Sequence, residues 1–222
     1  MGKLIVLEGV DCSGKSTQFR MLCEKLTADG LSFRKLTFPR YSEPSSELIK
    51  MYLGGSFGSN PSDVNPYAAS TFFAVDRFAS YAQDWRGFYE DGGILLTDRY
   101  TTSNAIHQGA KIPPEKRGEF FRWLYDFEFG LMGIPAPDAV IYLEVTLDIA
   151  LRRIRSRAAK TGTEADIHES DAGYLRTCIE CGEQAAASLG WTVVPCVKDG
   201  IEREREEKNL SIYNIVRAAL DA

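Results

Sequence analysis

The sequence predicts an α/β protein whose core is a five-stranded parallel sheet flanked by helices. Short apolar segments suited to buried strands alternate with longer segments whose apolar residues recur at helical spacing. A glycine-rich turn joins the first strand to the first helix, and no internal repeat or interdomain linker follows it. At 222 residues, the chain is expected to form one domain, residues 1–222.

The first strand, residues 4–8, leads into a motif that binds phosphate. The motif consists of Gly9, Val10, Asp11, Cys12, Ser13, Gly14, Lys15, Ser16 and Thr17. It fits the pattern G-x-x-x-x-G-K-[ST], in which two glycines let successive backbone N–H groups turn inward around an anion. An amphipathic helix follows and adds its positive N-terminal end. We therefore expect this loop to bind the phosphates of a nucleotide.

Two side chains of the loop suit a nucleoside triphosphate in particular. Lys15 supplies a positive charge for the β- and γ-phosphates. The hydroxyl of Ser16 suits an octahedral Mg²⁺ that keeps several waters. A chance glycine-rich turn is the alternative, and the strand-like and helical flanks argue against it.

The second strand is predicted over residues 31–38, after Gly30 ends the first helix. This β-α-β unit implies parallel strands and a right-handed crossover. Pro39 and Arg40 follow at the carboxyl edge of the strand, where ligands bind in open α/β sheets. Arg40 is thus a candidate for contact with a bound phosphate, and an exposed arginine in a turn is the alternative.

Helices are predicted next, over residues 47–53 and from Asn65, an N-cap before a proline, to about Tyr89. Phe73 and Arg77 lie one turn apart on the second helix and project from the same face. An aromatic plane beside a guanidinium suits a nucleobase. Phenylalanine in a helix is more often part of the core, so the structural alternative stays open.

The third strand, residues 94–97, is short and apolar, as expected in a parallel sheet. Asp98 and Arg99 follow it and would face the phosphate loop, the carboxylate near Mg²⁺ and the guanidinium on a phosphoryl oxygen. A structural salt bridge is the alternative. The helix predicted over residues 101–108 brings three more polar side chains to the same cleft: Ser103, His107 and Gln108.

The second half of the chain continues the alternation. An aromatic-rich helix begins near Pro113, and the remaining elements are a strand at 139–143, helices at 150–160 and 170–189, a strand at 191–194, and a charged segment with a final helix at 201–220.

Arginines are concentrated in the helix at 150–160, before a polar, glycine-containing stretch. This pattern favours a basic lid, at about residues 157–169, over a solvated helix face. Its candidate catalytic charges are Arg153, Arg157 and Lys160.

Composition and charge exclude several classes of protein. A net charge of −5 argues against general nucleic-acid binding, which needs a basic face. No apolar run approaches the roughly 20 residues of a membrane span, and a strand starts almost at the first residue, so we expect a cytoplasmic protein. The five cysteines do not suggest a disulfide framework, and we interpret Cys178 and Cys181 as reduced thiols on a helix rather than a metal site.

A phosphate loop indicates nucleotide binding and no more. A switch or motor would use hydrolysis to move loops, whereas a kinase needs a second anionic pocket and a lid that excludes water. Arg40, Arg99 and the arginine-rich helix supply a second set of positive groups. The residues therefore favour a kinase.

The chain resembles the thymidylate kinase family of nucleoside monophosphate kinases over almost its whole length. The resemblance depends on Glu8 to Thr17, Phe38-Pro39-Arg40, Phe73 four residues before Arg77, Asp98-Arg99-Tyr100, Pro137-Asp138, and Ala150-Leu151 followed by Arg153 and Arg157. It implies a P-loop NTPase fold with a lid, transfer of the γ-phosphoryl group of ATP to dTMP with Mg²⁺, and a homodimer.

The resemblance also implies roles for individual residues. Phe73 would stack on thymine and Arg77 would bond its O4 atom. Asp11 would lie near the sugar or phosphate of the acceptor, Arg99 and Arg40 would hold its phosphate, and Asp98 would lie near the metal.

Three positions depart from the family pattern. Cys12 stands where some members have an arginine in the phosphate loop, so the charge would come from the lid. The lid reads Asp166-Ile167-His168-Glu169 and lacks the arginine of the family's Asp-Arg-x-Glu. His107 replaces a tyrosine or phenylalanine that packs on deoxyribose.

Other functions remain as alternatives at this stage. A deoxynucleoside kinase would accept thymidine instead of dTMP, and another nucleoside monophosphate kinase would prefer another base. An ATPase switch, or a nucleotide-binding partner without turnover, would show no reaction that depends on an acceptor.

Overall fold

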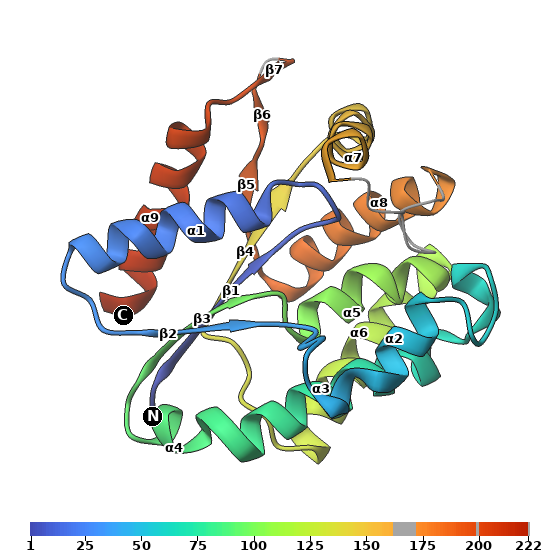
Figure 1. Ribbon diagram of the computed structural model, residues 1–222, viewed down its shortest axis with the longest axis horizontal. Helices are drawn as coiled ribbons and strands as arrows, with labels where there is room; N and C mark the ends of the chain where they lie inside the picture. Colours follow the sequence, from blue (N-terminus) through green and yellow to red (C-terminus); the bar gives the residue numbers. More distant parts are fainter. Residues whose placement is uncertain (162–171, 199, 222) are drawn as a thin grey trace.

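The computed structural model describes residues 1–161, 172–198 and 200–221. Its main sheet has five parallel strands in the order β2-β3-β1-β4-β5, which confirms the predicted fold class (Figure 1). These strands are β1 (Lys3–Glu8), β2 (Arg34–Thr37), β3 (Ile94–Asp98), β4 (Ala139–Glu144) and β5 (Thr192–Pro195).

Helices cover both faces of the sheet (Figure 1). The α-helices are α1 (Lys15–Ala28), α2 (Glu47–Leu53), α3 (Pro66–Ser80), α4 (Arg86–Glu90), α5 (Thr101–His107), α6 (Arg117–Tyr125), α7 (Leu147–Thr161), α8 (Ala172–Leu189) and α9 (Arg205–Asp221). Helix α1 packs against α9, and α5 packs against α8. A buried apolar cluster joins these layers and includes most of β1 and β4. No described helix is long and apolar enough to cross a membrane.

Several element boundaries differ from those that the sequence predicts. Strand β2 covers only four of the eight expected residues, because its register on β3 extends only from Arg34, opposite Leu95, to Thr37, opposite Asp98. The helix expected from Asn65 to about Tyr89 is interrupted by a π-helical turn at Tyr81–Trp85. Its start is as predicted, since the Asn65 side chain accepts a hydrogen bond from the backbone N–H of Ala68.

A small antiparallel pair, β6 (Val197–Lys198) and β7 (Ile201–Glu202), was not predicted. Gly200, between the two strands, has φ of 78°, which glycine adopts without strain. An Asp-Gly pair between two short strands is a known signal for a β-hairpin, so this hairpin could have been predicted from the sequence.

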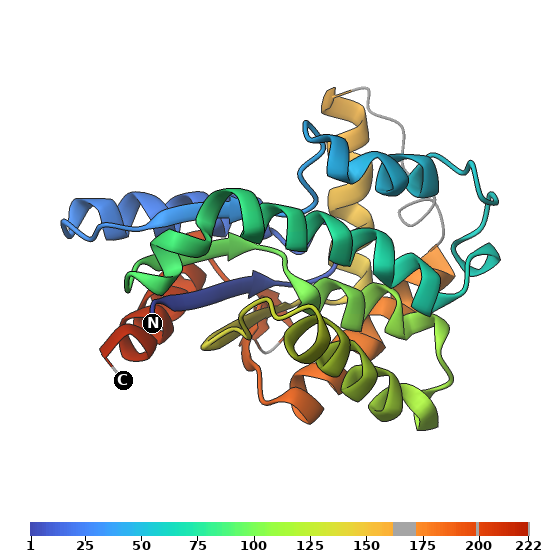
Figure 2. The same cartoon turned by 90° about the horizontal axis from the view of Figure 1, so that it is seen from below.

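The strand register places the phosphate loop beside the end of β3. Leu7 pairs with Asp98, so the carboxyl ends of β1 and β3 lie side by side. Both chain termini lie at the opposite end of the molecule, away from α2 and α7 (Figures 1 and 2). Loops from β1 and β3 therefore meet at one edge of the sheet, where ligands bind in such folds.

Candidate active site

The phosphate loop has the backbone that its glycines predict. Gly9 and Gly14 have φ of 155° and 103°. A Cβ on Gly9 would lie 2.7 Å from the hydroxyl of Ser13 and 3.0 Å from the carbonyl oxygen of Leu143. Glycine is therefore required at position 9 for both torsion and space.

Lys15 begins α1 and is only 6% exposed. Its ammonium group donates hydrogen bonds to the carbonyls of Gly9, at 2.7 Å, and Val10, at 2.9 Å. Burial lowers the pKa of Lys15, and the nearby charge of Arg99 lowers it further, while neighbouring carboxylates act in the opposite direction. The lysine thus lies inside the loop whose anion it is expected to contact.

A cavity beside the loop brings the predicted donor residues together. Its lining includes Lys15, Ser16, Asp98, Arg99, Arg153 and Arg157. These residues come from α1, the end of β3 and α7. The residues predicted to bind the donor phosphates and the metal, and the two arginines predicted for catalysis, thus line the same cavity.

The residues at this cavity fit a magnesium ion. Oδ1 of Asp98 is buried and has no hydrogen-bond partner within the part of the chain that the structure describes. A buried carboxylate oxygen without a partner is costly unless a cation or another donor satisfies it. The hydroxyl of Ser16 lines the same cavity. One carboxylate and one hydroxyl, completed by phosphate oxygens and waters, is a ligand set that Mg²⁺ commonly uses.

Arg153 reaches from α7 to the phosphate loop. Its Nη1 donates to the carbonyls of Cys12, at 3.0 Å, and Ser13, at 2.6 Å. Its Nη2 donates to Glu202 of β7, which the sequence did not single out. A second cavity extends beyond this contact, between the loop and the start of α9, and its lining includes Gly14 and Lys208.

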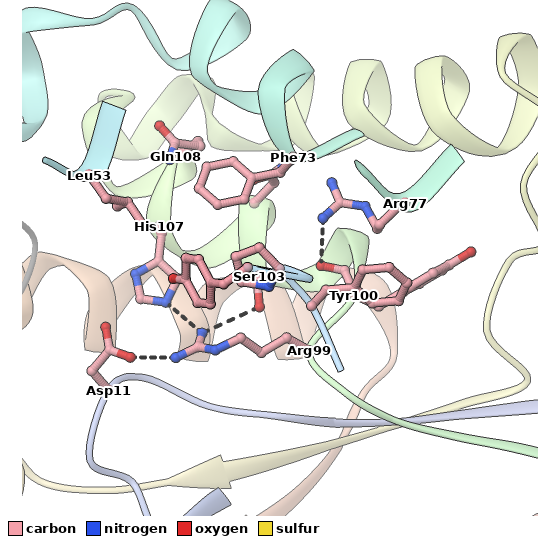
Figure 3. A pocket seen from close by; sticks show the side chains of 13 residues that line it. Asp11, Leu53, Phe73, Arg77, Arg99, Tyr100, Ser103, His107 and Gln108 are labelled. Atoms are coloured by element: carbon pink, nitrogen blue, oxygen red, sulfur yellow. Dashed lines mark hydrogen bonds and ion pairs between the residues drawn. The ribbon is translucent and has the colours of Figure 1, made fainter. Parts of the chain in front are cut away.

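A separate pocket lies on the other side of Arg99 (Figure 3). Its lining includes all but one of the residues predicted to bind the second nucleotide: Asp11, Phe73, Arg77, Arg99, Ser103, His107 and Gln108. They come from the phosphate loop, α3, the end of β3 and α5, with Gln108 directly after α5. Asp11 and Arg99 line both this pocket and the cavity beside Lys15.

Arg99 is fixed from two sides. Its Nη2 donates to Asp11 of the phosphate loop, and its Nη1 lies 3.4 Å from the hydroxyl of Ser103 and 3.2 Å from Nε2 of His107. Its φ is 71°, and the one other non-glycine residue with positive φ in the described chain is Cys12. Such backbone strain is maintained where surrounding contacts impose it, often at functional sites.

Glu8, the last residue of β1, helps to hold Arg99 in place and was not among the predicted site residues. Its buried carboxylate accepts hydrogen bonds from Thr102 and Ser103, each at 2.7 Å, and lies 3.9 Å from the guanidinium of Arg99. Burial alone lowers the pKa of Arg99, but the charges of Asp11, Glu8 and Asp98 raise that pKa above its usual value. A carboxylate at the end of an apolar strand is the sequence signal for Glu8.

Arg77 forms a buried ion pair. Its Nε and Nη2 donate to Glu128 at 2.6 and 2.5 Å, and the two side chains are 2% and 0% exposed. Its Nη1 lies 3.4 Å from the carbonyl of Tyr100 (Figure 3). Arg77 therefore lines the pocket with a guanidinium that the protein already holds in place.

Arg40 is the one predicted phosphate contact outside the lining of this pocket, although its neighbours Pro39 and Tyr41 line it. Its Nε donates to Asp76 at 3.2 Å, and its Nη2 donates to Ser45 at 3.0 Å. Its contact with a bound phosphate stays a prediction.

Gln108 lines the pocket with a fully buried side chain. Neither its amide nitrogen nor its amide oxygen has a hydrogen-bond partner among the described residues. A buried amide without partners favours a ligand that supplies both a donor and an acceptor.

The lid predicted at residues 157–169 lies mostly outside the described residues. Helix α7 contains its first turn, with Arg157 at the cavity beside the phosphate loop. The side chain of Lys160 and the segment 162–171, with its Asp166-to-Glu169 motif, are outside the description.

Comparisons with known proteins place the chain in a family. The sequence profile of the thymidylate kinase family matches residues 7–217. Thymidylate kinase from Mycobacterium tuberculosis is 35% identical over 196 residues, covering 86% of this chain and 90% of the relative. Human thymidylate kinase is 29% identical over 222 residues, covering 99% and 94%.

A solved structure shares the fold. Thymidylate kinase from Candida albicans superposes with a TM-score of 0.72 at 22% identity, covering 98% of this chain and 92% of the other. The residues that match the family profile make up nearly the whole chain. The chain belongs to the thymidylate kinase family.

Proposed function

We propose that this chain transfers the γ-phosphoryl group of ATP to dTMP and forms dTDP and ADP, a step of thymidine nucleotide synthesis. Membership of the thymidylate kinase family supports the reaction. The observation that carries it is the shared lining of two cavities, since Asp11 and Arg99 border both the cavity beside Lys15 and the separate pocket lined by Phe73 and Arg77. Two nucleotides bound in them would bring their phosphates together there.

On the donor side, the phosphate loop and Lys15 would hold the ATP phosphates. The cavity between Gly14 and the start of α9 has room for the nucleoside part of ATP. Ser16 and Asp98 would hold Mg²⁺, which neutralises phosphate charge when it is bound. Arg153 and Arg157 would add positive charge from α7, as the transferring group needs.

On the acceptor side, Phe73 and Gln108 would contact the thymine base, and Arg77 would donate to its O4 atom through N–H groups that Glu128 leaves unused. Arg99 would hold the acceptor phosphate beside Asp11. The acceptor phosphate is itself the nucleophile, so the chain needs no general base. Catalysis then consists of alignment of the two nucleotides and neutralisation of the charge on their phosphates.

Two further features belong to the proposal. The chain would form a homodimer, which the exposed apolar side chains of Leu48 and Met51 on α2, and Val75 and Phe78 on α3, support. It would act in the cytoplasm, and its five free cysteines suit a reducing compartment.

A panel of acceptors tests the function. With ATP and Mg²⁺, ADP release should depend on dTMP and be much slower with dCMP, dAMP, dGMP and thymidine. Preference for thymidine over dTMP would identify a deoxynucleoside kinase. ADP release that no acceptor accelerates would identify an ATPase.

Replacing Asp98 by asparagine is expected to raise the Mg²⁺ concentration for half-maximal rate by about 10–100-fold. The amide keeps the shape of the side chain but removes the charge that attracts the cation. Titration of initial rates with MgCl₂ measures the effect, and Asp126→Asn, at an exposed position of the chain, is the control. Equal Mg²⁺ dependence in Asp98→Asn and the parent enzyme would contradict the assignment.

A further inference from the structure

The imidazole of His107 lies between two side chains from different elements. His107 ends α5 and is 7% exposed. Its Nε2 is 3.2 Å from Nη1 of Arg99, and its Nδ1 is 3.7 Å from the sulfur of Cys178 on α8 (Figure 3 shows the Arg99 contact). Both ring nitrogens therefore have a defined neighbour.

The contact with Arg99 determines which ring nitrogen carries the proton. A guanidinium has five N–H donors and no acceptor, so it can only donate to Nε2. The carboxylates around Arg99 raise its pKa, so the guanidinium stays charged. Nε2 must then present its lone pair, and a neutral imidazole carries its proton on Nδ1.

The surroundings of Nδ1 fit a proton there. Burial raises the pKa of the Cys178 thiol, which therefore stays uncharged at neutral pH. Its sulfur is a weak acceptor for Nδ1–H. The backbone of His107 is also fixed, because the hydroxyl of Tyr174 on α8 donates to its carbonyl oxygen.

We propose that His107, as the neutral Nδ1–H tautomer, is a positioning residue that uses its Nε2 lone pair to aim Arg99 at the acceptor phosphate. This inference rests on the proposed function, in which Arg99 holds the acceptor phosphate. Asp11 holds Nη2 of the same guanidinium, and His107 and Ser103 hold Nη1.

The arrangement makes acceptor binding sensitive to acid. If His107 were protonated, its Nε2–H would face an N–H of Arg99 and the hydrogen bond would be lost. The imidazolium would also place a second positive charge beside the guanidinium. Among the described residues, the ionisable groups that contact His107 or its partner Arg99 include Asp11 in the phosphate loop, Glu8 at the end of β1, and Cys178 and Tyr174 on α8. Lys111 lies near enough to Cys178 to affect its charge. Protonation of His107 would therefore weaken the contact that holds Arg99.

Nitrogen-15 NMR tests the tautomer directly. The chain has two histidines, and a His168→Gln variant leaves only the signal of His107. Two-bond ¹H–¹⁵N correlations at pH 7.5 should show a protonated Nδ1 and an unprotonated Nε2. A protonated Nε2, as either the other tautomer or an imidazolium, would overturn the proposal, and this result does not depend on catalytic activity.

Kinetics tests the positioning role. In His107→Gln, the amide oxygen can accept from Arg99 at every pH, whereas His107→Phe has no acceptor. We expect His107→Phe to lower kcat/KM for dTMP at pH 8 at least tenfold, mostly through the acceptor KM, because it loses a hydrogen bond to a charged group. His107→Gln should recover most of that loss, and the KM for ATP should stay unchanged in both.

A comparison of pH profiles separates protonation of His107 from protonation of the acceptor phosphate, whose second pKa is about 6. Both enzymes use the same acceptor, so the effect of protonating its phosphate cancels in the ratio of kcat/KM for the parent enzyme to kcat/KM for His107→Gln. This ratio should fall toward low pH, because the imidazole of His107 can take up a proton and the amide of His107→Gln cannot.

A His107→Phe enzyme as active as the parent at pH 8, or a His107→Gln enzyme no better than His107→Phe, would refute the positioning role. Absence of dTMP kinase activity in the parent enzyme would instead refute the proposed function. The NMR result would still decide the tautomer in that case, and also if His107→Phe failed to fold.

Discussion

Lys15→Ala is expected to lower kcat for dTMP phosphorylation by at least about 10²–10³-fold, the typical cost of one lost transition-state charge contact. The ammonium group of Lys15 lies inside the phosphate loop and lines the same cavity as Asp98 and Arg99. Its charge opposes the negative charge that moves between phosphates, in a buried place where water cannot replace it. Initial rates at saturating ATP and dTMP measure the loss.

Lys116→Ala is the matched control, because this lysine is exposed and lies before α6. Its kcat should equal that of the parent enzyme. Thermal unfolding of Lys15→Ala will show whether the loop variant keeps its fold. A folded Lys15→Ala enzyme with nearly normal turnover would contradict the role given to the loop.

Arg77→Ala is expected to lower the free energy of unfolding by about 3–5 kcal/mol, because it leaves the charge of Glu128 buried and unpaired. Where the variant folds, the KM for dTMP should rise, since Arg77 also lines the acceptor pocket. Urea unfolding and steady-state kinetics measure the two effects. Arg34→Ala, which removes an exposed ion pair with Asp84, should cost no more than about 1 kcal/mol.

The double variant Arg77→Met with Glu128→Gln separates the two roles of Arg77. It removes both charges, so it should regain part of the stability that Arg77→Ala loses. It should not regain the KM for dTMP, because the donor to the base is still missing. Recovery of both would assign Arg77 a structural role only.

The fold was predictable because its signals are local. The apolar strand, the glycine-rich turn and the amphipathic helix of residues 4–28 are contiguous, and they imply parallel strands wherever the unit repeats. The ends of β2 were not predictable in this way. An edge strand extends only as far as its partner allows, and that partner, β3, lies about 60 residues further along the chain.

The candidate site was predictable where chemistry follows a motif. Lys15 and Ser16 are in a recognisable pattern, and Asp98 and Arg99 follow a buried strand whose carboxyl end had to lie near the loop. Their shared cavity agrees with that reasoning.

The partners of these residues were not predictable, because they come from distant segments. Glu128 lies 51 residues after Arg77, and Glu202 lies 49 residues after Arg153. Cys178 meets His107 only because α8 packs against α5. No local pattern specifies such pairs, since the tertiary arrangement of helices creates them.

A crystal structure with dTMP and a non-hydrolysable ATP analogue would test the central claim most directly. It should show the two phosphate ends meeting between Lys15 and Arg99, with thymine beside Phe73. A dTMP molecule bound away from the region between Phe73 and Arg99 would contradict the account.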